Sequence, residues 1–220
     1  MAKSRIERRT AQLRRRKYAR QLWNAFEGPL FTRNAVLTAG LGVFPILAGA
    51  NGWESALALC LLCVVTMVPV CLLSSLIGQR LPIWMRPPIS VVLAAALLWL
   101  VHVWQPWLLR TTGEVGCLMA VGSVMLSHAS DYAPGHVLMG TLADSLGAAF
   151  GFGAVAVIVG GLRTLLAGSV WWQQGDVWGI VPSEVAAQPF FGLLLLGVLA
   201  AALQKGNQVR RKWAKRREES

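Results

Sequence analysis

An acidic residue, Asp144, lies inside the long apolar run of residues 136–167. A carboxylate within a membrane segment is energetically costly and by default marks a functional position. Asp144 could bind a cation, carry a proton, or pair with a donor in a helix bundle. A structural role, in which the carboxylate accepts hydrogen bonds from backbone N–H groups at a helix end, fits the sequence equally well.

Arg163 lies near the far end of the same apolar run. A long cationic side chain in that position commonly extends along its aliphatic stem to the membrane surface, and this is our prediction. The alternative is an ion pair with an acidic residue of a partner subunit.

Four cysteines, all in apolar segments, could in principle ligate a metal. Cys60, Cys63 and Cys71 share one face of an expected helix, and Cys117 lies in a later segment. A metal site would need about four ligands, with positive charge nearby to stabilise thiolates. The sequence around these cysteines offers neither, so we expect small buried hydrophobic side chains and no metal.

Three histidines are the other candidate ligands: His102, His128 and His136. A haem held by two histidines needs both at a similar depth in the membrane. His102 lies near one end of its segment, whereas the other two flank a turn on the opposite side. Haem binding is therefore not expected.

The composition places the chain in a membrane. Of its 220 residues, 55% are hydrophobic and 14% are charged, whereas a typical soluble domain has about 25% charged residues. The expected fold class is an all-α polytopic membrane protein.

Basic residues are concentrated at the two ends of the chain. Ten of the 21 Lys and Arg residues precede Asn34 and seven follow Gln204, with a net charge of +11. Basic flanks of membrane segments stay on the cytoplasmic side and attract anionic lipid head groups. We predict that both termini are cytoplasmic, that anionic lipids are partners, and that nucleic acid is not.

Six apolar segments follow one another: residues 34–50, 54–78, 83–105, 115–129, 136–167 and 188–203. The first and fourth are shorter than the roughly 20 residues that a spanning helix needs. Gly42 and Pro45 interrupt the first, and Gly122 interrupts the fourth. Two short, interrupted segments at matching positions indicate an inverted repeat. We predict six transmembrane segments as two inverted three-helix repeats, residues 34–105 and 113–204, with broken first and fourth helices.

The remaining residues flank the membrane domain of residues 34–204 or connect its helices. Residues 1–33 form a basic cytoplasmic segment, in which residues 5–26 are expected as a helix on the membrane surface, with disorder of residues 1–15 as the alternative. Residues 106–114 are expected as a short connection, 169–186 as an extramembrane loop, and 205–220 as a basic cytoplasmic tail.

Several short motifs occur in a characteristic order: Gly42-Val-Phe-Pro45, Arg80-Leu-Pro-Ile83, Ser123-Val-Met-Leu-Ser-His-Ala129, Asp144, and Gly160-Gly-Leu-Arg163. Their order and spacing over residues 22–203 resemble the small membrane subunits of the Rnf and Na+-translocating NADH:quinone oxidoreductase complexes. These are the RnfE/NqrD and RnfA/NqrE families. The basic ends favour the RnfE/NqrD side.

This resemblance implies a fold, a role and partners. The families share a six-helix inverted-repeat fold, and an E-like subunit pairs with a homologous A-like subunit around an intramembrane 2Fe-2S cluster. The cluster relays electrons between flavins or clusters on other subunits, which include flavoproteins and iron–sulfur subunits. The redox reaction is linked to Na+ or H+ movement, so this chain would be a non-autonomous subunit of a redox-driven translocase.

The sequence departs from the family at the cluster ligands. Phe44 stands where the family has cysteine in the first broken segment, and Ser123 stands where it has cysteine in the second. Phenylalanine cannot ligate iron, and serine is a poor substitute for a thiolate. Cys117, six residues before Ser123, is a weak candidate because it would need a register shift. No cofactor is therefore assigned to this chain.

Two polar family positions are kept or replaced conservatively. Asp144 matches an aspartate of the family, and His128 replaces its usual arginine, so Asp144, Ser123, His128 and Arg163 are the candidates for an ion path or for polar structural roles. Two other functions stay open: a small secondary transporter or channel with a substrate site at the broken helices, and a structural or assembly paralogue without redox activity.

Overall fold

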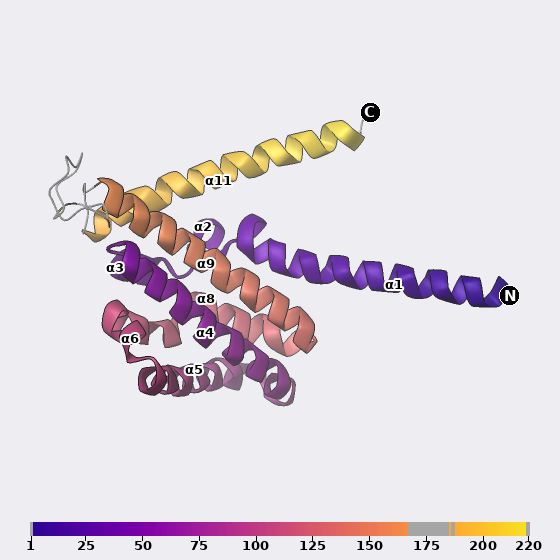
Figure 1. Ribbon diagram of the computed structural model, residues 1–220, viewed down its shortest axis with the longest axis horizontal. Coiled ribbons are helices and arrows are strands. Elements are labelled where there is room, and N and C mark those ends of the chain that lie inside the picture. The colour runs from indigo at the N-terminus through magenta and orange to yellow at the C-terminus, as the bar shows by residue number, and fades with distance from the viewer. Residues whose placement is uncertain (1, 167–184, 186–187, 219–220) are drawn as a thin grey trace.

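A computed structural model gives the fold and describes residues 2–166, 185 and 188–218 (Figure 1). Within these residues every regular element is a helix or a helical turn. Four helical stretches are long and apolar enough to cross a membrane: Trp53–Arg80, Ile83–Trp104, Leu138–Leu166 and Pro189–Val209. The predicted class, an all-α polytopic membrane protein, is confirmed at this level.

The first interrupted segment consists of two short helices, α2 (Ala35–Ala39) and α3 (Val43–Gly49). Asn34 begins α2, since its side chain accepts hydrogen bonds from the N–H groups of Val36 and Leu37, at 3.0 and 3.2 Å. The chain leaves α2 and enters α3 through Gly40 and Gly42, whose φ angles are +68° and +70°. Only glycine adopts this left-handed conformation without strain, so the position of the break follows from the sequence.

The second interrupted segment is cut into four short pieces: α7 (Glu114–Leu118), η4 (Met119–Val121), α8 (Ser123–Leu126) and the π-helical turn η5 (Ser127–Tyr132). Gly122 is extended, with φ −62° and ψ 132°, and separates η4 from α8. A further turn, η6 (Ala133–Gly135), leads into the next long helix. Both segments predicted to be broken are therefore interrupted at their glycines, whereas Pro45 lies inside the first turn of α3, where a missing N–H costs nothing.

The core lies between α4 (Trp53–Ile77) and α9 (Leu138–Leu166), which run side by side through the middle of the bundle (Figure 1). Small residues on α9 allow this close approach. A methyl group on Gly160 would lie 2.8 Å from the carbonyl oxygen of Gly52, and one on Gly153 would meet Cys60. The helix α9 is the most buried of the four candidate spans.

The N-terminal helix α1 (Ala2–Glu27) is anchored to α9 only near its end. The carbonyl group of Phe26 lies against Gly147, and the π-helical turn η1 (Gly28–Thr32) lies against Gly151. Figure 1 shows the rest of α1 extending away from the bundle. A helix was predicted here and is confirmed, and its placement on the membrane surface stays a prediction.

Two predicted boundaries were wrong. Residues 106–114 are largely helical, as α6 (Pro106–Thr112), because Pro106 ends α5 (Arg86–Trp104) and then occupies the first position of a new helix, where proline is favoured. The last helix, α11 (Pro189–Glu218), does not end at residue 203. Its basic continuation is rich in Lys and Arg, which favour helix, so most of the predicted tail belongs to the same helix. The predicted loop of residues 169–186 lies almost entirely outside the described residues.

The contact between α1 and α9 gives a direct test of the packing. Gly147→Ala places a methyl group against the backbone carbonyl of Phe26, and backbone cannot move aside as a side chain does. We expect the free energy of unfolding to fall by about 1–3 kcal/mol, measured by thermal unfolding in detergent. Gly140→Ala on the same helix is the control, since its methyl group would lie 4.0 Å from the nearest atom. It should be neutral or stabilising by up to about 1 kcal/mol, and equal effects of the two substitutions would contradict this packing.

Candidate functional site

The two interrupted segments meet at their breaks. The backbone N–H of Gly42 donates a hydrogen bond of 3.0 Å to Oγ of Ser123, across 81 residues of sequence. Gly42 immediately precedes α3, and Ser123 is the first residue of α8. This bond joins the two interrupted segments directly.

An open hollow of about 560 Å³ lies where the breaks meet, and we call it the break hollow. Its lining residues are Gly40, Gly42, Val43, Phe44, Pro45, Leu47, Leu118, Val121, Gly122 and Ser123. Phe44 is 59% exposed there, with Val121 and Leu118 also exposed. The hollow is thus bordered by apolar side chains that the described part of the chain leaves uncovered.

The break hollow does not fit an iron–sulfur cluster held by this chain. Its ten lining residues include no cysteine, and Phe44 offers only carbon. The hydroxyl of Ser123 already accepts the N–H of Gly42. Cys117 is exposed and does not line the hollow. The donor set needed for such a cluster, mainly thiolates, is missing from the hollow.

Asp144 pairs with His128. Nδ1 of His128 lies 2.6 Å from Oδ2 of Asp144, which joins the π-helical turn η5 to α9. The two side chains are 15% and 7% exposed, so the pair is largely shielded. This short hydrogen bond gives each of two largely buried polar side chains a partner. The sequence marked both residues but did not pair them. The sequence feature that could have suggested the pair is a basic residue, His128, shortly after the second helix break, followed by a single acidic residue, Asp144, in the next apolar helix.

A buried hydroxyl lies one helical turn from Asp144. Thr141 precedes it by three residues on α9, which places both on one face, and Oγ1 of Thr141 has no hydrogen-bond partner among the described residues. Buried polar groups are nearly always paired. The neighbourhood of the His128–Asp144 pair therefore keeps an unused polar group inside the bundle.

Arg163 is 1% exposed, which makes the prediction that it reaches the membrane surface wrong. Its Nη1 donates to the carbonyl oxygens of Leu47 and Ala50, at 3.2 and 3.0 Å, and to Oδ1 of Asn51, at 2.9 Å. Its Nη2 donates to the carbonyl oxygen of Gln188, at 3.2 Å. The physical reason is the end of α3, because the last carbonyl groups of a helix lack partners and carry partial negative charge that favours a cation.

The remaining candidate ligands lie apart from one another. Cys63 and Cys71 are buried and Cys60 is half-buried along α4. His136 stacks on Tyr132, with ring centroids 3.8 Å apart, and His102 is exposed on α5. Within the part of the chain that the structure describes, no three His, Cys, Asp or Glu side chains converge as metal ligands would.

The glycines at the first break allow the conformational and the packing costs to be separated. Gly40→Ala forces a left-handed backbone in open space, and should cost about 1–2 kcal/mol. Gly42→Ala adds contacts with Val124 Cγ2 at 2.6 Å and Phe152 Cε2 at 3.2 Å, so it should cost about 1–3 kcal/mol more. Thermal unfolding of both variants measures the difference. A Gly42→Ala variant no less stable than Gly40→Ala would show that α8 does not pack on this break.

These features define a class: a helical membrane protein whose two interrupted segments meet inside the bundle, beside a buried His–Asp pair. Residues 22–204 match the family model described as Rnf-Nqr subunit, membrane protein. The chain belongs to the Rnf-Nqr family of membrane subunits.

Two similar proteins are each named as the E subunit of an ion-translocating oxidoreductase complex. The protein of Azotobacter vinelandii is 25% identical over 188 residues, which cover 80% of this chain and 77% of that protein. The protein of Methanosarcina acetivorans is 25% identical over 130 residues, which cover 57% of this chain and 61% of that protein. The resemblance seen in the sequence motifs is confirmed.

Proposed function

We propose that this chain is an E-like membrane subunit of an ion-translocating oxidoreductase complex of the Rnf/Nqr type, and that it acts only together with other subunits. Membership of the Rnf-Nqr family over most of the chain and the names of both relatives support this function. The membrane is the inner membrane of a bacterium, with both termini cytoplasmic. The basic residues at both ends of the chain support that orientation and contacts with anionic lipids.

The membrane domain, on this proposal, consists of two inverted repeats with six segments. Corresponding helices of the two proposed repeats occupy corresponding positions in the bundle, which supports the inverted-repeat symmetry. The two interrupted segments touch through Gly42 and Ser123. The long helix that follows each interrupted segment, α4 in the first repeat and α9 in the second, forms the core. The last long helix of each repeat, α5 in the first and α11 in the second, is less buried than the core helix of the same repeat.

The break hollow is the face on which a homologous A-like subunit docks. The observation that carries the proposal is the meeting of the two helix breaks at one uncovered hollow. Two breaks from distant parts of the chain converge on a hollow rimmed by exposed Phe44, Leu118 and Val121. A broken helix with free backbone groups is tolerated at membrane depth only where it is covered by protein or faces a water-filled cavity. A second subunit would supply that cover.

This chain contributes no ligand to an intramembrane cluster. A 2Fe-2S cluster would supply one-electron transfer across the membrane in complexes of this type, but the hollow holds Phe44 and Ser123 where thiolates are needed. Electron transfer therefore depends on the flavin-bearing and iron–sulfur partner subunits. The chain itself contributes the scaffold, the partner surface and an ion path past Asp144, with His128, Ser123 and Arg163 in supporting polar roles.

Co-purification of the intact complex tests the proposed docking face. Phe44→Gln combined with Val121→Gln should reduce recovery of the A-like subunit with the tagged chain by about 10-fold, as expected from losing roughly 1.4 kcal/mol of binding. Val92→Gln is the control, because Val92 is also exposed but lies on α5, outside the break hollow. Unchanged recovery of the double variant would contradict this docking face.

Liposomes that contain the isolated chain test the alternative of an autonomous transporter. Without partner subunits the proposed subunit should move neither Na+ nor H+ above the level of empty liposomes. Sustained ion movement by the chain alone would refute the subunit proposal and favour a secondary transporter or channel.

A further inference from the structure

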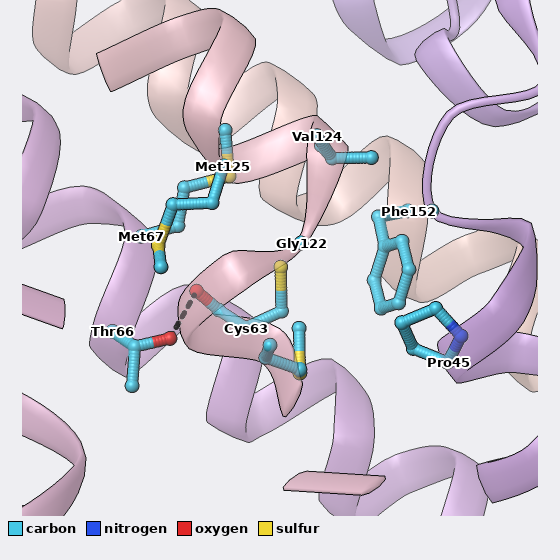
Figure 2. A pocket seen from close by; sticks show the side chains of 10 residues that line it. Pro45, Cys63, Thr66, Met67, Gly122, Val124, Met125 and Phe152 are labelled. Carbon is cyan, nitrogen blue, oxygen red and sulfur yellow. Dashed lines mark hydrogen bonds between the residues drawn. The ribbon is translucent and has the colours of Figure 1, made fainter. Parts of the chain in front are cut away.

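A second, much smaller cavity with a mostly buried lining adjoins the break hollow, and we call it the inner cavity (Figure 2). It is lined by Gly42, Pro45, Cys63, Thr66, Met67, Met119, Gly122, Val124, Met125 and Phe152. Three of these, Gly42, Pro45 and Gly122, also line the break hollow. The residues at the helix breaks therefore form the partition between the break hollow and the inner cavity.

The lining of the inner cavity is rich in sulfur. Cys63 and Met67 come from α4, Met119 from η4 and Met125 from α8, and all four are buried. The chain has six methionines, so half of them converge on one space from three separate elements. Figure 2 shows Cys63, Met67 and Met125 at the cavity, with the Cys63 sulfur directed toward Gly122. A single methionine fills gaps in many cores, whereas one cysteine and three methionines in the lining of the same space supply four candidate sulfur ligands.

Side-chain oxygen and nitrogen ligands are scarce at this cavity, with one hydroxyl in its lining. Its only hydroxyl, on Thr66, donates to the carbonyl oxygen of Leu62 at 2.7 Å within its own helix. No carboxylate, imidazole or amide side chain lines the space. Hard cations such as Na+, Mg2+ or Ca2+ prefer oxygen, so this lining selects against them.

Size and charge narrow the ligand to one monovalent ion. The space is about 10 Å³, and about that volume admits a single water-sized sphere. A cluster of several metal atoms does not fit. One thiolate with three neutral thioethers balances a single positive charge, whereas a divalent ion would leave a net charge buried without a partner, which is costly.

We propose that the inner cavity binds one soft monovalent metal ion of the Cu(I) and Ag(I) class. The Cys63 thiolate and the thioethers of Met67, Met119 and Met125 are its ligands, since soft sulfur ligands select Cu(I). On binding, the S–H bond of Cys63 breaks, a sulfur–metal bond forms and the proton leaves to solvent. No electron is transferred. The ion enters through the shared partition from the break hollow. This site does not depend on the proposed function.

Ag+ is the probe, because it has the same charge and ligand preference and does not cycle between oxidation states. The full chain is purified in detergent as Cys117→Ser, which removes the exposed thiol. Equilibrium dialysis followed by elemental analysis should give one tightly bound Ag+ per chain. X-ray absorption at the silver edge should show sulfur neighbours only.

Variants in this background locate the site. Cys63→Ser, Met67→Leu and Met125→Leu should each weaken Ag+ binding by about 10- to 100-fold. Leucine conserves methionine volume, so the Met→Leu variants test ligation if Cys63→Ser fails to fold. Matched controls are Cys71→Ser, another buried thiol on α4, and Met139→Leu, an exposed methionine. Both should bind as the parent does. Absence of tight binding, or binding that Met67→Leu and Met125→Leu leave unchanged, would overturn the proposal and leave the sulfur atoms as packing.

Discussion

Arg163→Ala is expected to lower the midpoint of thermal unfolding in detergent by about 6–20 °C, the largest effect on stability of any single change considered. Removing the guanidinium strips the donors from the carbonyl oxygens of Leu47, Ala50 and Gln188 and from the Asn51 side chain. Leaving such buried groups unpaired costs about 3–5 kcal/mol in total, and each kcal/mol corresponds to about 2–4 °C in a chain of this size.

Two further variants separate the hydrogen bonds from the charge. Arg163→Lys keeps the positive charge but cannot present a planar fork to several acceptors, so it should recover only part of the lost stability. Arg110→Ala removes an exposed arginine on α6 and should leave the midpoint within about 2 °C, since such surface changes cost little. If Arg163→Ala unfolded at the same temperature as Arg110→Ala, the end of α3 would not depend on Arg163.

Asp144→Asn is expected to reduce redox-driven ion translocation by the assembled complex by about 10²-fold, the low end of what a positioned ionisable group contributes to a proton transfer. The amide keeps the size of the side chain and one hydrogen bond to His128, but it has no charge to exchange with an ion. Ion flux into vesicles that hold the complex, driven by its electron donor, is the measurement. Recovery of all subunits with the tagged chain is the check that assembly is intact.

Replacing the partner residue distinguishes charge compensation from proton exchange at His128. His128→Arg places a permanent cation next to Asp144 in space, although the two residues are 16 positions apart in sequence. Translocation should survive, because the proposed ionisable group is Asp144 and the resembling families use arginine at this position. Translocation that is intact in Asp144→Asn would contradict the ion path and favour a structural or assembly role for the chain.

The sequence was sufficient where the relevant physics is local. Glycines at residues 40, 42 and 122, inside runs too short to span a membrane, predicted where the helices break. The small residues of 136–167 are also visible in the sequence, and they permit the close packing of α9 on α4. Long apolar stretches likewise predicted the first three of the four candidate spans with boundaries close to those observed, whereas the last one extends beyond its predicted end.

The sequence was insufficient where partners are distant in the chain. The acceptors of Arg163 lie 112 to 116 residues before it, apart from Gln188. Nothing local distinguishes such a buried arginine from one that reaches the membrane surface. The pairing of His128 with Asp144 likewise depends on how η5 rests on α9. The sulfur atoms of the inner cavity come from three elements, so their convergence appears only in the fold.

The uninterrupted helix α11 has a mechanical consequence. Its 30 residues make a rod of about 45 Å, and its apolar part, Pro189–Val209, already measures about 32 Å, close to the hydrocarbon thickness of a bilayer. The last nine residues therefore stand clear of the hydrocarbon on a stiff stalk about 13 Å tall. A soluble protein that binds these nine helical residues would be held at a fixed distance from the membrane surface and in a fixed orientation relative to the helix bundle.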